Sequence, residues 1–281
     1  MTYCIAIKLN TGLVMLSDSR TNAGVDHIST FKKMMVFEKP DDRVLVLMSS
    51  GNLAISQAVR QHISQATSGK TIWSANNLFE VAQLMGDAVR AVAQRETKPL
   101  ESAGVEFNIN LLLGGQIAGE PPRLFHIYAA GNFIEASDEN CYFQIGEAKY
   151  GKPIIDRVVT PDTSLDEAAK CALISMDSTL KSNLSVGLPL DLLLYHTNSL
   201  AVTQVAHIDE KNTYFQMIRN TWGKRLKQVF TEIEPPTWSA DAPEHGFYKP
   251  IRDTASEPSE LVTTQPTLQQ LSLGGLAQQA S

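Results

Sequence analysis

Apolar and polar positions along this chain change their spacing several times, and each change predicts a different kind of element. Two apolar runs at the start predict strands joined at Asn10-Thr11-Gly12, because Asn and Gly favour a tight hairpin turn. Apolar residues at every third or fourth position predict amphipathic helices instead. In chain order we expect strands at 3–9, 13–18, 33–38 and 43–50, helices at 52–66 and 77–96, strands at 106–114, 122–129 and 141–145, a helix at 164–182, strands at 189–196 and 199–207, and a helix at 211–230.

The order of these elements indicates the fold class. Helices occur in blocks between antiparallel hairpins, which is typical of domains whose helices cover the faces of antiparallel sheets. We therefore expect an α+β domain at residues 1–235, with two stacked sheets and helices on both outer faces. Residues 236–281 differ, because prolines recur along them and their end is rich in Gln, Ser, Leu and Gly. This composition predicts a flexible C-terminal tail that does not join the core.

The composition limits the classes of function that this chain can have. The chain has 281 residues, 43% of them hydrophobic, and a net charge of -6, which argues against nucleic-acid binding. We expect no membrane span and no secretory signal, because the sequence has neither an apolar run of about 18 residues nor a charged start followed by an apolar stretch. Cys4, Cys141 and Cys171 are scattered like reduced thiols, and the histidines lack metal-site spacing. We expect a cytoplasmic protein that uses neither cofactor nor metal.

The candidate nucleophile is Thr2, at the start of the first predicted strand. Removal of Met1 is expected because the next side chain is small, and it would leave a threonine with a free α-amine. Such a residue carries a nucleophile and a base together, since the amine can take the hydroxyl proton through a water. The pKa of an α-amine is about 8, so a useful fraction is neutral near pH 7. The sequence therefore predicts N-terminal-nucleophile hydrolysis.

Three further residues complete this chemistry. Asp18 ends the second strand, so the hairpin can return it to Thr2, and Lys33 lies at the start of the third strand. A lysine beside the hydroxyl lowers its proton affinity, and a carboxylate keeps that lysine charged and oriented. Gly51 opens a helix, where backbone N–H groups can stabilise an oxyanion. We expect Arg20 to support this loop through a carboxylate or carbonyl groups.

These residues lie in strings that resemble a known family. Thr2, SDSRT, FKKM and SGNLA resemble the start of proteasome β subunits and of the bacterial HslV peptidase. The similarity is greatest to their bacterial relatives, the Anbu family, in the strings SDSRTNAGVDHISTF and GNLAI. The resemblance covers residues 1–235 and implies the four-layer αββα sandwich of N-terminal-nucleophile hydrolases. It implies Thr2 as nucleophile, Asp18 and Lys33 as its supporting pair and the Gly51 amide as oxyanion donor, with Lys32 as an alternative to Lys33.

The family pattern differs from this chain at two places. Proteasome β subunits have a Gly-Ser-Gly segment whose serine supports the terminal amine, and Glu147 stands where that serine would be. Their later Asp-x-x-Ser-Gly-Gly motif aligns with residues 182–187, where Ser182 replaces the aspartate while Ser185 and Gly187 are kept. Glu147 either compensates for the missing acid or is only an acid at a helix start.

The resemblance implies a threonine peptidase that acts on peptide or protein substrates through an acyl-threonine ester. It also implies a homo-oligomer, either a ring or a helical assembly. We find no phosphate-binding loop, so ATP-driven unfolding would need a separate ATPase. Two alternatives stay open: an amidase for a small or unusual peptide, and a proteasome-like scaffold with a weak or vestigial site.

Overall fold

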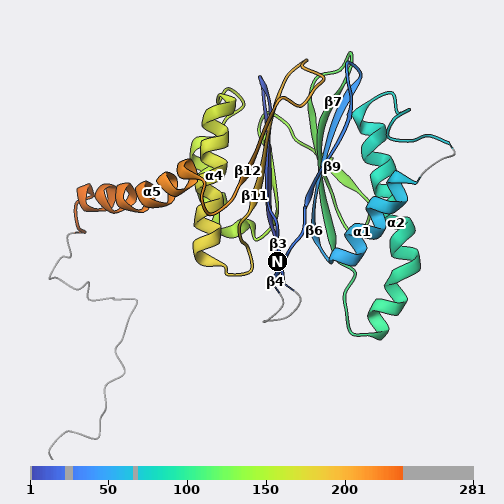
Figure 1. The fold of residues 1–281 in the computed structure, drawn as a ribbon, viewed down its shortest axis with the longest axis horizontal. Coiled ribbons are helices and arrows are strands. Elements are labelled where there is room, and N and C mark those ends of the chain that lie inside the picture. Colours follow the sequence, from blue (N-terminus) through green and yellow to red (C-terminus); the bar gives the residue numbers. More distant parts are fainter. Residues whose placement is uncertain (1, 23–27, 66–68, 237–281) are drawn as a thin grey trace, which may run out of the picture. The chain divides into compact units, whose positions relative to one another are not determined.

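Two five-stranded antiparallel sheets form the centre of the fold (Figure 1). The computed structural model describes residues 2–22, 28–65 and 69–236. From edge to edge, the first sheet contains β10 (Tyr142–Gly146), β1 (Tyr3–Leu9), β2 (Gly12–Asp18), β11 (Leu190–His196) and β12 (Gln204–Ile208). The second sheet contains β5 (Met34–Lys39), β6 (Arg43–Gly51), β7 (Ile109–Ile117), β8 (Arg123–Ile127) and β9 (Phe133–Glu135). A separate antiparallel pair joins β3 (Arg20–Asn22) to β4 (Ile28–Thr30).

Helices cover the outer face of each sheet, which gives the four-layer αββα arrangement of Figure 1. The second sheet carries α1 (Leu53–Ser64) and α2 (Leu78–Ser102). The first sheet carries α3 (Lys152–Val158) and α4 (Leu165–Ser182), preceded by a short 3-10 helix at Ala148–Tyr150. The last helix, α5 (Thr213–Glu232), contacts α4.

Side-chain caps fix where four of these helices begin. Asn52, Asn77, Ser164 and Asn212 each accept a backbone N–H of the first helical turn through their side chains. Such a cap satisfies an N–H group that has no partner within the helix and stabilises it by about 1 kcal/mol. The cap at Asn52 matters most for function, because Asn52 directly follows Gly51. Gly51 was expected to open this helix, but it is the last residue of β6 and α1 begins at Leu53.

Three apolar clusters hold the layers together. One lies between the sheets and includes Met15, Met48 and Leu193. The others join each sheet to its helices, with Leu16 packed towards α4 and Leu47 packed towards α1 and α2. Leu16 and Met15 are neighbours in β2, so alternate side chains of one strand enter different clusters. Central strands such as β1 and β2 are therefore buried on both faces, whereas the edge strand β12 is mostly exposed.

The αββα fold expected from the sequence is confirmed, but some boundaries and elements were predicted wrongly. α2 extends beyond position 96 to Ser102, where Gly104 ends it by adopting a left-handed φ of 69°. The strand expected at 199–207 is shorter, because turn residues with positive φ precede it at Asn198 and Leu200. The short elements β3, β4, β9 and α3 were missed. The predicted tail lies almost entirely outside the described residues and stays a prediction.

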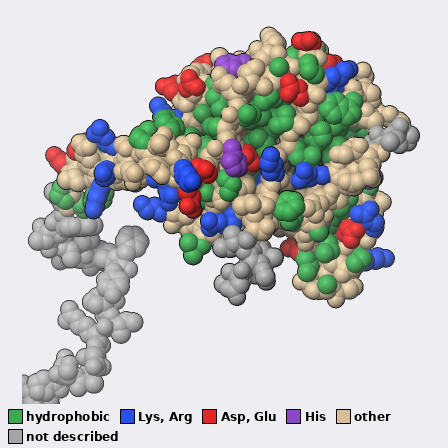
Figure 2. Space-filling view, in the orientation of Figure 1, with side chains coloured by type: hydrophobic (Ala, Val, Ile, Leu, Met, Phe, Trp, Pro, Cys, Tyr) green, Lys and Arg blue, Asp and Glu red, His purple; other side chains and the backbone are tan. Residues whose placement is uncertain are grey.

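The surface of the described residues shows no segregation of charge by sign in the view of Figure 2. Basic and acidic side chains are interspersed on this face, and apolar side chains are exposed between them. Among the described helices, none is long and apolar enough to cross a bilayer.

Gly86 tests how closely α2 approaches the turn between β8 and β9. A Cβ at Gly86 would overlap the carbonyl oxygen of Gly131, whereas a Cβ at Gly223 in α5 meets no atom within 4 Å. We expect Gly86→Ala to lower the free energy of unfolding by about 1–3 kcal/mol through overpacking. The control Gly223→Ala should raise it by up to about 1 kcal/mol, because alanine favours helix. Urea unfolding measures both, and equal midpoints for the two variants would contradict the close contact.

Candidate active site

Thr2 is held at the start of β1 by the neighbouring edge strand. Its carbonyl oxygen accepts a hydrogen bond from the backbone N–H of Glu147 at 2.8 Å. The preceding residue, Gly146, pairs with Tyr3 in the sheet. Gly146 has a left-handed φ of 81°, and a Cβ there would overlap the Thr2 carbonyl oxygen. Only glycine suits both conditions. The result is a threonine that is 7% exposed and fixed in position.

Asp18 and Lys33 form a buried ion pair beside Thr2. The Lys33 Nζ donates to Asp18 Oδ1 at 2.6 Å and to the Arg20 carbonyl oxygen at 2.7 Å. Asp18 Oδ1 also accepts the backbone N–H of Tyr3 at 3.0 Å, which ties the pair to the residue that follows Thr2. The Asp18 side chain is fully buried and that of Lys33 is 7% exposed. The structure therefore brings together Thr2, Asp18 and Lys33 from three strands or strand ends.

The surroundings of Asp18 act on its charge in two directions. Burial raises the pKa of its carboxyl, because removal from water disfavours a carboxylate. Lys33 and the N–H groups of Tyr3 and Gly187 act against that rise by stabilising the charged form. Burial also raises the pKa of the Cys4 thiol far above its usual value, so Cys4 stays neutral.

The turn after α4 contacts the second carboxylate oxygen of Asp18. The Gly187 N–H donates to Asp18 Oδ2 at 3.3 Å, and the Arg20 guanidinium packs so closely on Gly187 that a Cβ would overlap its Nε. Arg20 donates to the Leu184 carbonyl oxygen at 2.9 Å, so it supports this turn through a carbonyl group. Ser185 lies in the same turn, where its N–H donates to Asn183.

Ser182 lies apart from these residues. It is exposed at the end of α4. Among the described residues, no hydrogen bond joins it to Thr2, Asp18 or Lys33. The structure thus leaves Ser182 outside the group around Thr2, and Lys32, the alternative to Lys33, is exposed.

A cavity of about 470 Å³ opens beside Thr2. Gly51 lies on its wall at the end of β6, with a φ of 106°, and a Cβ there would overlap the Asn108 carbonyl oxygen. Glu147 lines the same cavity, and its carboxylate lies 3.9 Å from Lys149. The complete lining is Thr2, Ser50, Gly51, Asn108, Asn110, Gly146 and Glu147.

Asn108 and Asn110 are site residues that sequence reasoning missed. They flank a buried isoleucine at the start of β7, and Asn110 Oδ1 lies 3.2 Å from His126 Nε2. Two amides within the apolar run that becomes β7 are the signal that could have identified them, because such strands seldom carry polar residues without a role. Among the residues that the structure describes, no three His, Cys, Asp or Glu side chains could hold a metal ion.

Comparisons with known proteins identify the family. The family model described as "Proteasome subunit" matches residues 2–188, the segment that contains Thr2, Asp18, Lys33 and Gly51. The chain therefore belongs to the proteasome subunit family. The curated proteasome subunit beta of Haloquadratum walsbyi is 23% identical over 210 residues, which cover 74% of this chain and 79% of the relative.

Solved structures place the similarity more narrowly, among Anbu proteins. Anbu from Yersinia bercovieri is 50% identical, with a TM-score of 0.79, and the match covers 84% of this chain and all of that one. The structure titled "Helical Assembly of the Anbu Complex from Pseudomonas aeruginosa" is 42% identical, with a TM-score of 0.81, over 85% of this chain and all of that one. The resemblance to Anbu that the sequence indicated is thus confirmed.

Lys33→Met tests the electrostatics of the pair. The variant keeps a buried Asp18 but removes its cation, so we expect the free energy of unfolding at pH 8 to fall by about 3–5 kcal/mol. The loss should shrink as the pH falls towards 5. Burial raises the pKa of Asp18 in the folded variant, so this state binds a proton at a pH where the unfolded aspartate, with a pKa of about 3.9, does not.

The control for this experiment is Lys8→Met. Lys8 pairs with the exposed Asp138 at 3.6 Å, and exposed pairs contribute about 0–1 kcal/mol. Urea unfolding of both variants and the wild-type protein at pH 5 and pH 8 gives the comparison. An equal loss for Lys33→Met at both pH values would show that Asp18 does not carry a raised pKa there.

Proposed function

We propose that this chain is an N-terminal threonine hydrolase that cleaves amide bonds in peptides, acting in the cytoplasm. The observation that carries the proposal is the Asp18–Lys33 pair, buried at 2.6 Å beside a threonine that opens onto a cavity. A buried charge pair is costly to maintain, and sites with such pairs are frequent where a nucleophile must be activated. Membership of the proteasome subunit family supports the same reaction.

The reaction begins once Met1 has been removed. The Thr2 hydroxyl attacks the substrate carbonyl carbon, and its proton passes through a water to the α-amine of the same residue. Lys33 lowers the proton affinity of the hydroxyl, and Asp18 holds Lys33 in place. The carbonyl oxygen becomes an oxyanion, which the Gly51 N–H stabilises from the wall of the cavity.

The intermediate then collapses in two steps. The C–N bond breaks, the α-ammonium returns the proton to the leaving amine, and an ester remains on the Thr2 hydroxyl oxygen. A water deprotonated by the α-amine attacks this ester, and the threonine hydroxyl and a carboxylic acid are released. Glu147 lines the cavity where that amine operates, and we assign it the supporting role that a serine has in proteasome β subunits.

We also propose that copies of this chain assemble around their sites. Most of α5 is exposed, including the apolar side chains of Met217, Leu226, Val229 and Phe230. Exposed apolar side chains grouped on one helix mark a protein contact more often than a free surface. The Pseudomonas aeruginosa relative forms a helical assembly, as its title states. The outer faces of α1 and α2 are further candidates for contacts between copies. A separate ATPase would be needed to unfold and deliver folded protein substrates.

A peptide epoxyketone tests the reaction directly, because this electrophile captures both the hydroxyl and the free amine of a terminal threonine. We expect the intact mass of the wild-type protein to lack Met1 and to increase by one probe per chain. Thr2→Ala should give no adduct because the hydroxyl is missing, whereas Thr2→Ser should still react.

Two controls separate loss of chemistry from loss of structure. Sedimentation of Thr2→Ala should match that of the wild-type protein, since the substitution leaves the backbone contacts of Thr2 in place. A wild-type protein that retains Met1, or that stays unmodified at every probe concentration, would refute the hydrolase. It would favour the scaffold with a vestigial site, which the replacement of the family's aspartate by Ser182 already suggests.

A further inference from the structure

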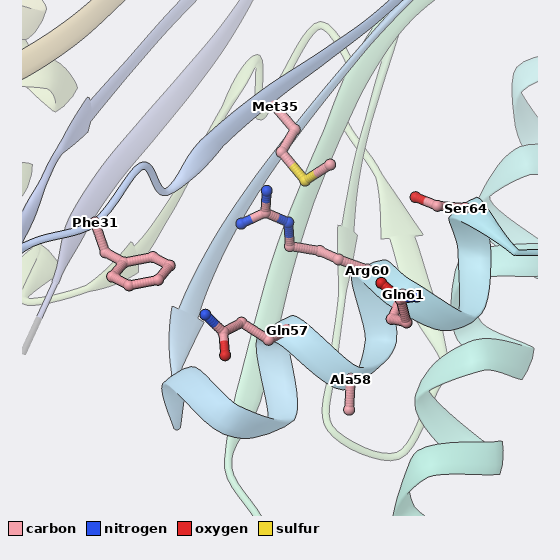
Figure 3. Close-up of a pocket in the computed structure, with 7 residues that line it drawn as sticks. All are labelled: Phe31, Met35, Gln57, Ala58, Arg60, Gln61 and Ser64. Atoms are coloured by element: carbon pink, nitrogen blue, oxygen red, sulfur yellow. The ribbon is translucent and has the colours of Figure 1, made fainter.

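A second cavity is lined by residues on both sides of Lys33 in the chain. It has a volume of about 540 Å³ and opens between α1 and the chain that enters β5 (Figure 3). Figure 3 shows the Arg60 guanidinium extending from α1 towards Met35, with the Gln57 amide beside it and the Phe31 ring opposite. Gln61 and Ser64 complete the helical wall.

The one charged group of this cavity is a cation, its other polar side chains each offer a donor, and none of its lining residues is acidic. Arg60 contributes a permanent positive charge, and Gln57 and Gln61 contribute amide N–H groups. No ion pair between Arg60 and an acidic side chain occurs among the described residues, and its guanidinium donates a long hydrogen bond of 3.5 Å to the Lys32 carbonyl oxygen. Partial burial lowers the pKa of Arg60, in keeping with a cation that lacks a counter-ion.

The two segments that line this cavity continue along the chain to candidate active-site residues. Phe31 and Met35 stand on either side of Lys33 in the chain, and the Phe31 N–H donates to the Ser19 carbonyl oxygen at 2.7 Å, next to Asp18. The helical wall belongs to α1, whose N-cap residue Asn52 directly follows Gly51. Arg60 follows Leu53, the first residue of α1, by seven residues, which is about 10 Å along the helix axis. Its guanidinium reaches the carbonyl oxygen of Lys32, the residue before Lys33.

We propose that this cavity binds a carboxylate side chain of the substrate, so that Thr2 reacts preferentially with peptides that carry a glutamate beside the scissile bond. The Arg60 guanidinium pairs with the carboxylate, the glutamine amides donate to its oxygens, and Phe31 and Met35 contact the methylene groups. Arg60 is a specificity-determining residue in this arrangement. The proposal rests on the hydrolase function proposed above and names its substrate class.

Two matched probes test the preference. They are acetylated tripeptide epoxyketones that are identical except for Glu or Gln at the residue that bears the electrophile. The rate of adduct formation on Thr2, measured by intact mass, should be about tenfold higher for the Glu probe, since hydrogen bonds to charged groups contribute more than neutral ones. Arg60→Gln should make the two rates equal. Arg157→Gln, on the exposed surface of α3, should keep the difference.

A binding experiment that needs no reaction keeps the two proposals separate. Acetylated tripeptide amides ending in Glu or Gln are titrated calorimetrically into Thr2→Ala, which cannot turn them over. We expect about tenfold tighter binding of the Glu peptide, lost in Thr2→Ala/Arg60→Gln. Tighter binding of the Glu peptide without any wild-type adduct would refute the hydrolase and keep the carboxylate site. Adducts at equal rates, with no difference in binding, would refute the carboxylate site and keep the hydrolase.

Discussion

The buried carboxylate of Asp18 is the constraint on which the rest of the site depends. It receives a lysine from the start of β5, one backbone N–H from β1 and another from the turn after α4. A fully buried carboxylate is stable only when such donors surround it, so each of these segments must occupy one position. The same contacts set the place of Thr2, because Tyr3 is its neighbour. One set of hydrogen bonds therefore both stabilises the buried carboxylate and fixes the position of Thr2.

Close backbone approach is the second requirement, and three glycines meet it. Gly146, Gly51 and Gly187 each lie where a Cβ would overlap an atom of another segment. Two of them also have a left-handed φ, which other residues adopt only with strain. The proposed nucleophile, the proposed oxyanion donor and the loop that Arg20 supports can therefore lie closer together than side chains at these positions would permit.

Much of this architecture could be predicted from the sequence, because its signals are local. The apolar runs of β1, β2 and β6 and the helical spacing of α1 required no knowledge of distant contacts, and the strings around Asp18, Lys33 and Gly51 indicated the family. Asn108 and Asn110 could not be assigned, since their role depends on which strand end adjoins Thr2. The positions of Ser182 and Ser185 also depended on how the chain turns after α4, which neither periodicity nor spacing determines.

The contacts that hold Thr2 come from far along the chain. Its carbonyl is bound by the strand end near residue 146, and Asp18 is bound near residue 187. Contacts of such large sequence separation form late, because the intervening chain must first be ordered. During synthesis, the candidate active site cannot be complete until these segments have emerged from the ribosome. The contacts that fix Thr2 are thus complete only when nearly the whole domain exists.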